Sequence, residues 1–258
     1  MRVNFFEEFP TAENMRKLDL VDWPSTLFVA AHSFAEFENI RKTYGKPYPH
    51  IVFGWWPLIR GAYWISGFTD SKRLKGLFAE AGTSHTQPLP LLLDLELPRD
   101  LRAWFGNLPH VSGNKKLIWR FIEHAHEANI RVYTAEHPVA ADFFLFLERA
   151  AGITFPFSEN HVRIPMVYTS LGWTAIRKRM WNSIQRFEAA LINKNPGMTI
   201  PALGTIAQGI WKNEPILPPE QLGKDLSWAK EAGAEEVFIF RLAGLTERYT
   251  AVIKPFLA

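Results

Sequence analysis

The stretch that decides the fold is Pro90–Pro98, which reads PLLLDLELP. A continuous apolar run bounded by prolines is typical of a strand buried on both faces, as in a parallel sheet. Side chains alternate along a strand, so Asp94 and Glu96 point the same way, ~6.6 Å apart at ~3.3 Å per residue. Burying both carboxylates is unfavourable, because each loses hydration and each repels the other. The pair therefore indicates either a functional site or an exposed strand end where both are solvated.

Seven other segments have the composition of strands, and helix-like segments separate all eight. These strands are expected over Arg2–Phe6, Ser25–His32, His50–Trp56, Ile130–Glu136, Val162–Ser170, Thr199–Gln208 and Glu236–Arg241. The alternation predicts a (β/α)₈ TIM barrel of the α/β class, formed as a single domain over residues 1–258. A doubly wound open sheet is the alternative, but no glycine-rich nucleotide-binding fingerprint follows the first strand.

Capping residues and prolines mark the expected helix boundaries. Ser33 precedes a helix that ends at Gly45, and Pro218 opens another that ends near Gly233. Further helices are expected over 11–18, 70–81, 99–129 with breaks near Pro109 and Gly113, 139–151, 173–193 and from 246 onward. Each helix lies between two predicted strands or after the last one, as the barrel requires.

The composition narrows the classes of partner. The hydrophobic fraction of 47% is ample for a large core, and the net charge is only +3. Because no basic block with interleaved aromatic residues is present, nucleic acid is not expected as a partner. No apolar stretch approaches the length of a membrane span, so no membrane partner is expected either. The composition gives no indication of the oligomeric state.

The chain has no cysteine, which excludes disulfides, thiolate chemistry and cysteine zinc sites. Its first residues, MRVNFFEEFP, include two glutamates and lack the long apolar core of a signal peptide. A cytoplasmic location is therefore expected.

In a barrel of this kind the active site lies at the carboxyl ends of the strands. The residues that the sequence puts there are Glu7, Glu8, His32, Trp55, Trp56, Asp94, Glu96, Glu136, His137, Tyr168, Gln208 and Arg241. Carboxyl groups supply general acids and bases, and flat aromatic faces suit sugar rings. The set therefore favours a small-molecule or carbohydrate ligand.

Several of these residues also have a purely structural interpretation. Of the adjacent pairs Glu7/Glu8 and Trp55/Trp56, one member of each should face the barrel axis and the other the helices. Arg241 could pair with a carboxylate at the barrel mouth. Glu136 could favour the following helix N-terminus, and His32 could be a capping or solvated residue.

A metal site could be assembled from histidines and carboxylates at the strand ends, namely His32, Asp94, Glu96, Glu136 and His137. No local motif supports this set. His124 and His126 lie two apart in a helical segment and so fall on different faces. We therefore expect neither a metal nor another cofactor.

Two strands resemble family 18 glycoside hydrolases, the chitinase-like barrels. Asp94-Leu95-Glu96 is similar to the end of the family's D-x-x-D-x-D-x-E motif, and Met166-Val167-Tyr168 is similar to its M-x-Y segment. The resemblance implies that Glu96 is the general acid. It further implies that Asp94 orients the substrate's acetamido group and that Tyr168 donates to that group's carbonyl oxygen.

The resemblance is limited to these two short segments. Leu89 and Leu92 stand where the family motif has its earlier aspartates, and Thr169 replaces the acidic or amide residue that often follows the tyrosine. The D-x-E strand also resembles family 25 lysozymes. Those proteins carry an aspartate on the first strand, where this chain has Asn4 and then Glu7.

The residues and the resemblance together predict a barrel that hydrolyses a glycosidic bond, with Glu96 as the acid and Glu7 or Glu136 as its partner across the barrel. The substrate would contact His32, Trp55, Trp56, Gln208 and Arg241. Two alternatives stay open: a barrel that binds a sugar or similar small ligand without cleaving it, and a metal-assisted hydrolase or isomerase.

The protonation of the strand pair is part of this hypothesis. Burial and the neighbouring Asp94 are expected to raise the pKa of Glu96, as a general acid requires. Asp94 should stay ionised if it accepts hydrogen bonds from neighbours such as Tyr168.

Overall fold

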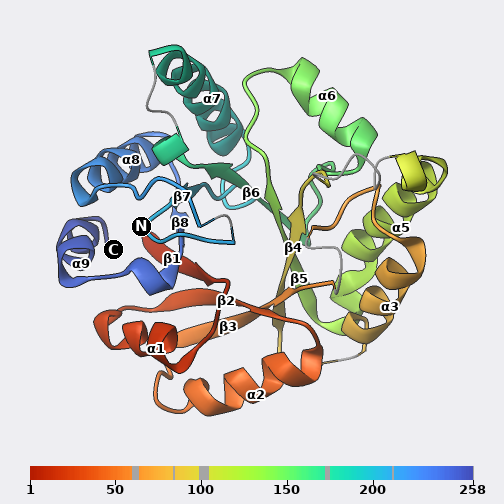
Figure 1. Cartoon of the computed structure of the whole chain (residues 1–258), viewed down its shortest axis with the longest axis horizontal. Helices are drawn as coiled ribbons and strands as arrows, with labels where there is room; N and C mark the ends of the chain where they lie inside the picture. Colours follow the sequence, from red (N-terminus) through yellow and green to blue (C-terminus); the bar gives the residue numbers. More distant parts are fainter. Residues whose placement is uncertain (60–63, 84, 99–104, 172–174, 211, 258) are drawn as a thin grey trace.

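The computed structural model describes residues 1–59, 64–83, 85–98, 105–171, 175–210 and 212–257. Eight parallel strands pair in sequence order and close into a barrel, which confirms the predicted (β/α)₈ fold. The strands are β1 (Arg2–Glu7), β2 (Ser25–Ala31), β3 (Ile51–Pro57), β4 (Leu89–Leu95), β5 (Ile130–Glu136), β6 (His161–Val167), β7 (Ala202–Gly204) and β8 (Glu236–Phe240). Figure 1 shows the helices arranged as an outer ring around this barrel.

The ring helices are α1 (Ala12–Met15), α2 (Phe34–Gly45), α3 (Ser71–Ala81), α5 (Val111–His124), α6 (Asp142–Ala151), α7 (Ala175–Lys194), α8 (Pro219–Glu231) and α9 (Glu247–Ile253). The predicted cap at Ser33 is present, because its side chain accepts from the backbone N–H of Glu36. Asp70, which was expected as the first residue of its helix, caps α3 by accepting from the backbone N–H of Arg73. No helix among the described residues is long and apolar enough to cross a membrane.

Two predicted segments differ from the structure. The expected strand over 199–208 pairs only over Ala202–Gly204, with an isolated bridge at Thr199. Pro201, which separates the bridge from the strand, has no N–H to donate to the ladder. The expected helical region over 99–129 contains α5, which runs through Gly113 without a break. Residues 99–104 of that region lie outside the described residues.

Strand alternation divides the apolar residues between two cores. Val3 and Phe5 of β1 face the helices, whereas Phe6 packs inside the barrel against Phe28 and Phe238. The ring centroid of Phe238 lies 4.9 Å from that of Phe6 and 5.3 Å from that of Phe28. These packed rings occupy the inside of the barrel.

Candidate functional site

A cavity of about 820 Å³ opens at the carboxyl end of the barrel. Its apolar lining includes Phe6 of β1, Leu92 of β4, Ala135 of β5 and Phe240 of β8. Every one of these residues belongs to the axis-facing set of its strand. Pocket-lining residues from six strands and from the loop after β7 therefore meet where the barrel architecture places catalytic sites.

Four carboxyl groups line this cavity. Asp94 and Glu96 come from the end of β4, Glu8 follows β1, and Glu214 lies on the loop after β7. Among the described residues, no lysine or arginine lines the cavity. The arrangement concentrates negative charge in a partly apolar space, which favours the protonated form of at least some of these groups.

Asp94 is buried, with 6% of its surface exposed. Burial raises the pKa of Asp94 well above its ordinary value, and the charges of Glu96 and Glu8 raise it further. Within the described part of the chain, no hydrogen bond reaches its carboxylate. The expectation that Tyr168 keeps Asp94 ionised by donating to it is therefore wrong for this structure.

Tyr168 follows β6 and lines the same cavity. Its pKa is also raised well above the ordinary value, first by burial and then by the carboxylates of Asp94, Glu96 and Glu8. Tyr168 is accordingly a neutral hydroxyl that is available to donate to a ligand. Asp94, Glu96 and Tyr168, on which the family resemblance rests, thus lie around one cavity.

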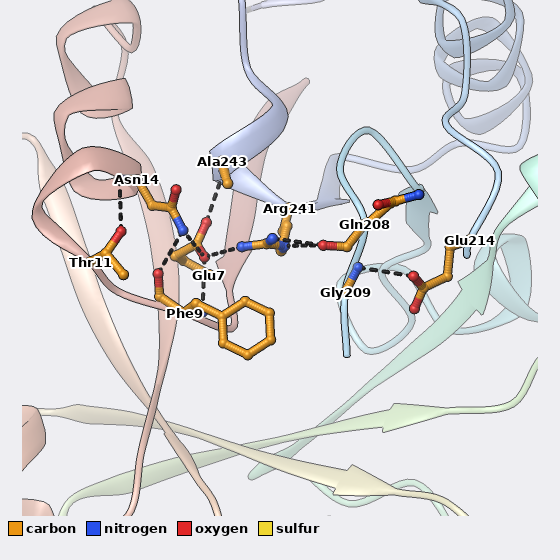
Figure 2. Close-up of polar contacts among 9 residues, drawn as sticks. All are labelled: Glu7, Phe9, Thr11, Asn14, Gln208, Gly209, Glu214, Arg241 and Ala243. Carbon is orange, nitrogen blue, oxygen red and sulfur yellow. Dashed lines mark hydrogen bonds and ion pairs between the residues drawn. The ribbon is translucent and has the colours of Figure 1, made fainter. Parts of the chain in front are cut away.

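Glu8 faces the cavity from just beyond β1. Burial raises the pKa of Glu8 to about 7; Glu214 and Glu7 add to the shift, while Arg241 and the backbone N–H of Ile210 oppose it. Glu214 is held by the backbone N–H of Gly209, whose nitrogen lies 3.1 Å from the Glu214 Oε2 (Figure 2). The loop after β7 therefore carries a fixed carboxylate to the cavity.

Glu7, expected as a partner across the barrel, points away from the cavity toward the helices. Figure 2 shows its carboxylate surrounded by donors: Arg241 Nη1 at 2.6 Å, the backbone N–H groups of Ala243 at 2.8 Å and Phe9 at 2.9 Å, and the Asn14 side chain at 3.2 Å. These contacts leave Glu7 no access to the cavity. Its neighbour Glu8, and not Glu7, lines the cavity across from the end of β4.

Arg241 and Gln208, expected as substrate contacts, do not line the cavity either. Arg241 donates to the Gln208 carbonyl oxygen through Nε at 3.0 Å and Nη2 at 2.6 Å, while the Gln208 side chain is exposed. The guanidinium also lies 4.8 Å from the ring centroid of Phe9. Arg241 thereby ties the end of β1 to the loop that carries Glu214.

Glu136, the other expected partner, lies between the barrel and the helices. It accepts hydrogen bonds from Arg163 Nε at 2.7 Å, Thr134 Oγ1 at 2.6 Å and Thr154 Oγ1 at 2.5 Å. The preceding residue, Ala135, faces the cavity. Because side chains alternate along a strand, Glu136 points away from the cavity.

The aromatic residues divide in the same way. Trp56 lines the cavity, whereas Trp55 is fully buried on the helix side and donates to the Ala31 carbonyl oxygen at 3.2 Å. Trp64 is half-buried at the cavity, and Tyr63 lies outside the described residues. His32 is exposed and does not line the cavity.

Residue-by-residue interpretation missed several members of the lining, among them Glu214 and Trp181. Glu214 belongs to a loop without periodicity, and Trp181 belongs to the apolar face of α7, a pattern indistinguishable from ordinary core packing. The position of Glu214 just after the seventh strand was the available signal, since this loop reaches over the barrel mouth. His137, which the sequence placed at a strand end, also lines the cavity. Among the described residues, no group of three histidine, aspartate or glutamate side chains has an arrangement that could hold a metal ion.

Comparisons with known proteins identify the fold. No family model and no curated protein matches the sequence. Solved structures do match along nearly the whole chain. A class V chitinase from Pseudomonas fluorescens Pf-5 shows 9% identity, a TM-score of 0.59 and coverage of 100% of this chain and 99% of its own.

Two further structures have similar scores. A glycoside hydrolase family 18 N-acetylglucosaminidase from Paenibacillus barengoltzii shows 8% identity, a TM-score of 0.56 and coverage of 99% of both chains. A xylose isomerase domain protein from Planctomyces limnophilus shows 12% identity, a TM-score of 0.55 and coverage of 98% of both. At these identities the chain shares with them the (β/α)₈ barrel fold.

Proposed function

We propose that the cavity hydrolyses a glycosidic bond by carboxyl-group catalysis. The observation that carries this proposal is the convergence of Asp94, Glu96, Glu8 and Glu214 on one aromatic-lined cavity at the carboxyl end of the barrel. Glycoside hydrolysis requires two carboxyl groups, one to protonate the leaving oxygen and one to act on the sugar or on water. A class V chitinase and a glycoside hydrolase family 18 N-acetylglucosaminidase have the same fold, which is in keeping with this chemistry.

Glu96 is the proposed general acid. It stands two residues beyond Asp94 on the same strand face, and its negative charge helps to raise the pKa of Asp94. Burial raises the pKa of Asp94, so this carboxyl group holds its proton to a higher pH than an ordinary aspartate does. Glu96 lies farther along the strand and is more exposed than Asp94, so it is the group that meets the leaving oxygen.

Glu8 is the proposed base, in place of Glu7 and Glu136. It reaches the cavity from the end of β1, a rigid element, and interacts electrostatically with Asp94. A general base is most effective when its pKa lies near the working pH, and the pKa of Glu8 is about 7. Glu214 adds negative charge that stabilises the oxocarbenium-like transition state.

The aromatic lining supplies the proposed binding surface. Trp56, Trp64, Tyr168 and Trp181 present ring faces or polar edges around the carboxyl groups. The indole N–H of Trp181 is buried, and no described residue accepts from it. A sugar ring offers apolar faces for stacking and hydroxyl oxygens that accept from such donors.

The test compares Glu96→Gln with the wild type on aryl glycosides and on β-1,4-linked oligosaccharides. Glutamine keeps the shape and removes the titrating proton, so turnover should fall by ~10²-fold or more, the usual contribution of a general acid. Glu127→Gln is the matched control, because Glu127 is exposed and precedes β5, at the end of the barrel opposite to the cavity. Both variants should fold as the wild type does.

Other results would support the alternatives. Binding of a sugar without turnover by the wild type would indicate a binding barrel. Turnover that depends on an added metal and is abolished by a chelator would indicate the metal-assisted reaction. Wild-type turnover by Glu96→Gln would show that the acid lies elsewhere.

A further inference from the structure

Large apolar side chains are exposed mainly at the end of the barrel where the cavity opens. Among the described residues, Val52 at the start of β3 is the exposed large apolar side chain at the opposite end. The others follow the carboxyl ends of strands, in loops or in the helices that these loops enter: Phe9, Phe105, Leu108, Phe143, Phe144, Phe146, Leu147, Leu171, Met180, Ile210 and Ile216. A concentration of exposed apolar residues on one part of a surface is typical of an interaction site.

Helix α6 contributes the largest share of this surface. Its side chains Phe143 and Phe146 are 65% and 66% exposed. Both ends of the helix lie at the cavity end of the barrel. Pro138, shortly before α6, lines the cavity, and Ala151, its last residue, accepts at 3.2 Å from the backbone N–H of Gly67 in the loop after β3. Figure 1 shows α6 between α5 and α7 in the outer ring, so its exposed apolar residues lie at the same end as the cavity.

The cavity itself has a polar side and an apolar side. Its four carboxyl groups come from β1, β4 and the loop after β7. The wall supplied by β6, by the turn after β6 and by α7 is mainly apolar and consists of Met166, Tyr168, Leu171, Met180, Trp181 and Ile184. This apolar wall lies in the same sector of the barrel as α6, which joins β5 to β6. Met180 is 49% exposed although it lines the cavity, so the apolar wall continues to the molecular surface.

The two sides of the cavity suit different chemical groups. A sugar hydroxyl that is pressed against methionine, leucine and isoleucine side chains loses hydration without gaining a hydrogen bond. An alkyl chain in the same place gains a favourable free energy for every CH₂ group that leaves water. On the opposite side, hydroxyl groups can donate to carboxylates. The cavity as a whole therefore fits a molecule with one polar and one apolar part.

We propose that the ligand of this cavity is an amphiphilic glycoside, whose sugar lies at the carboxyl groups and whose long alkyl chain lies along the apolar wall and leaves the cavity beside Met180. The sugar part of this inference rests on the proposed function. The chain part rests on the apolar wall and on its continuation to the surface. Such a ligand is either a dissolved monomer or a component of a lipid surface. In the second case the exposed residues of α6 meet the surrounding lipid.

The experiment titrates the full wild-type chain with S-linked alkyl glycosides, whose sulfur link resists hydrolysis, and follows binding by calorimetry. Two series are used, thioglucosides and N-acetylthioglucosaminides, each with butyl and octyl chains below the concentration at which micelles form. We expect octyl to bind at least ~10-fold more tightly than butyl in one series or both, because the longer chain takes more CH₂ groups out of water. Equal affinity for butyl and octyl in both series, or no binding of either octyl compound at millimolar concentration, would overturn the inference.

Two variants of the cavity lining are compared with a matched control. Met180→Gln keeps the length of the side chain and makes it polar, so the octyl-over-butyl gain should fall by ~3-fold or more. Ile210→Ser tests the same point on the loop after β7 if Met180→Gln fails to fold. Val52→Thr, at the other end of the barrel, is the control and should keep the full gain. Circular dichroism checks the fold of all three, and an equal gain in all three would overturn the inference.

A second measurement distinguishes the two sources of the ligand. Phosphatidylcholine vesicles that contain the same thioglycosides with hexadecyl chains are mixed with the wild type and with the double variant Phe143→Ser/Phe146→Ser, and vesicle-bound protein is measured by flotation. Vesicle binding by the wild type that the double variant loses, while it still binds the dissolved octyl compound, would support a ligand in a lipid surface. Binding of the dissolved octyl compound without vesicle binding would support a monomeric ligand.

The outcomes also separate this inference from the proposed function. An affinity that rises with chain length, without hydrolysis of the O-linked octyl glycoside, would support the inference and contradict the proposed reaction. Hydrolysis of the O-linked butyl and octyl glycosides with equal kcat/KM would do the reverse.

Discussion

At the scale of single residues, adjacent glutamates at the end of β1 have opposite roles. Glu7 is fully buried and paired with Arg241 at 2.6 Å, whereas Glu8 lines the cavity. Removing one member of a buried ion pair leaves the other charge uncompensated, which typically costs ~3–5 kcal/mol. The two residues should therefore respond differently to the same substitution.

We expect Glu7→Gln to lower the free energy of unfolding by about 3 kcal/mol or more, because Arg241 loses its carboxylate. Glu8→Gln should retain most of the stability and lose ~10²-fold or more in turnover, as a proposed base. Urea unfolding and turnover are measured on both variants. The assignment fails if Glu7→Gln is as stable as the wild type, or if Glu8→Gln keeps its activity.

The sequence could predict that polar residues at the strand ends matter, but not which of two neighbours faces the axis. In β1 both faces are apolar: Phe5 packs toward the helices and Phe6 inside the barrel. A strand buried on both sides has no polar–apolar alternation to read. The D-x-E spacing was readable because Asp94 and Glu96 necessarily share a face, whatever that face is.

At the scale of elements, the loop after β7 connects the structural ion pair with the cavity. Arg241 holds the Gln208 carbonyl oxygen, and the next residue, Gly209, binds Glu214. A Cβ at position 209 would lie 2.8 Å from Glu8 Oε2 and 2.9 Å from the ring of Phe240. The loop therefore packs against the cavity wall through a position that has no room for a side chain.

We expect Gly209→Ala to displace this loop and to reduce turnover by ~10-fold or more, since misplacing a catalytic group by about 1 Å can cost ~10²-fold. Gly76→Ala is the matched control: no atom lies within 4 Å of a Cβ built there, in the exposed part of α3. That change should keep activity and raise stability by ~1 kcal/mol, because alanine favours helix. Equal activity of the two variants would show that the loop does not position Glu214.

Element boundaries were predictable where a cap or a proline fixes them. Ser33 and Asp70 mark the starts of α2 and α3, and Pro219 begins α8. The apolar run over 199–208 did not show that β7 pairs only over Ala202–Gly204. Apolar composition alone does not show how far a ladder extends.

At the scale of the whole molecule, burial raises the pKa of several carboxyl groups and so favours their protonated forms. A second acidic cluster lies between the barrel strands and the helices, where Glu148 of α6 and Glu188 of α7 approach Glu136 and Arg163. Burial raises the pKa of Glu148 to about 8 and that of Glu188 to about 7. The barrel places these groups between its strands and the ring of helices, which no local sequence pattern indicates.

These shifts make stability depend on pH in a defined direction. In the unfolded chain the pKa of a glutamate is ~4.3, so between that value and the folded pKa the folded state binds more protons. The stabilisation is complete below the unfolded pKa and is lost as the pH rises through the folded one. For Glu148 this window extends from about 4.5 to about 8.

We therefore expect the free energy of unfolding contributed by these groups to fall as the pH rises from 5 to 9. Glu148→Gln should flatten the fall, since an amide is neutral at every pH and avoids the repulsion from Glu136 and Glu188. The variant should be more stable than the wild type at pH 9 and nearly equal to it at pH 5. Urea unfolding across this range measures the slope, and Glu231→Gln on the exposed face of α8 is the control. If Glu148→Gln and the wild type lose stability in parallel between pH 5 and pH 9, Glu148 is ionised in the folded protein and the buried cluster is organised differently.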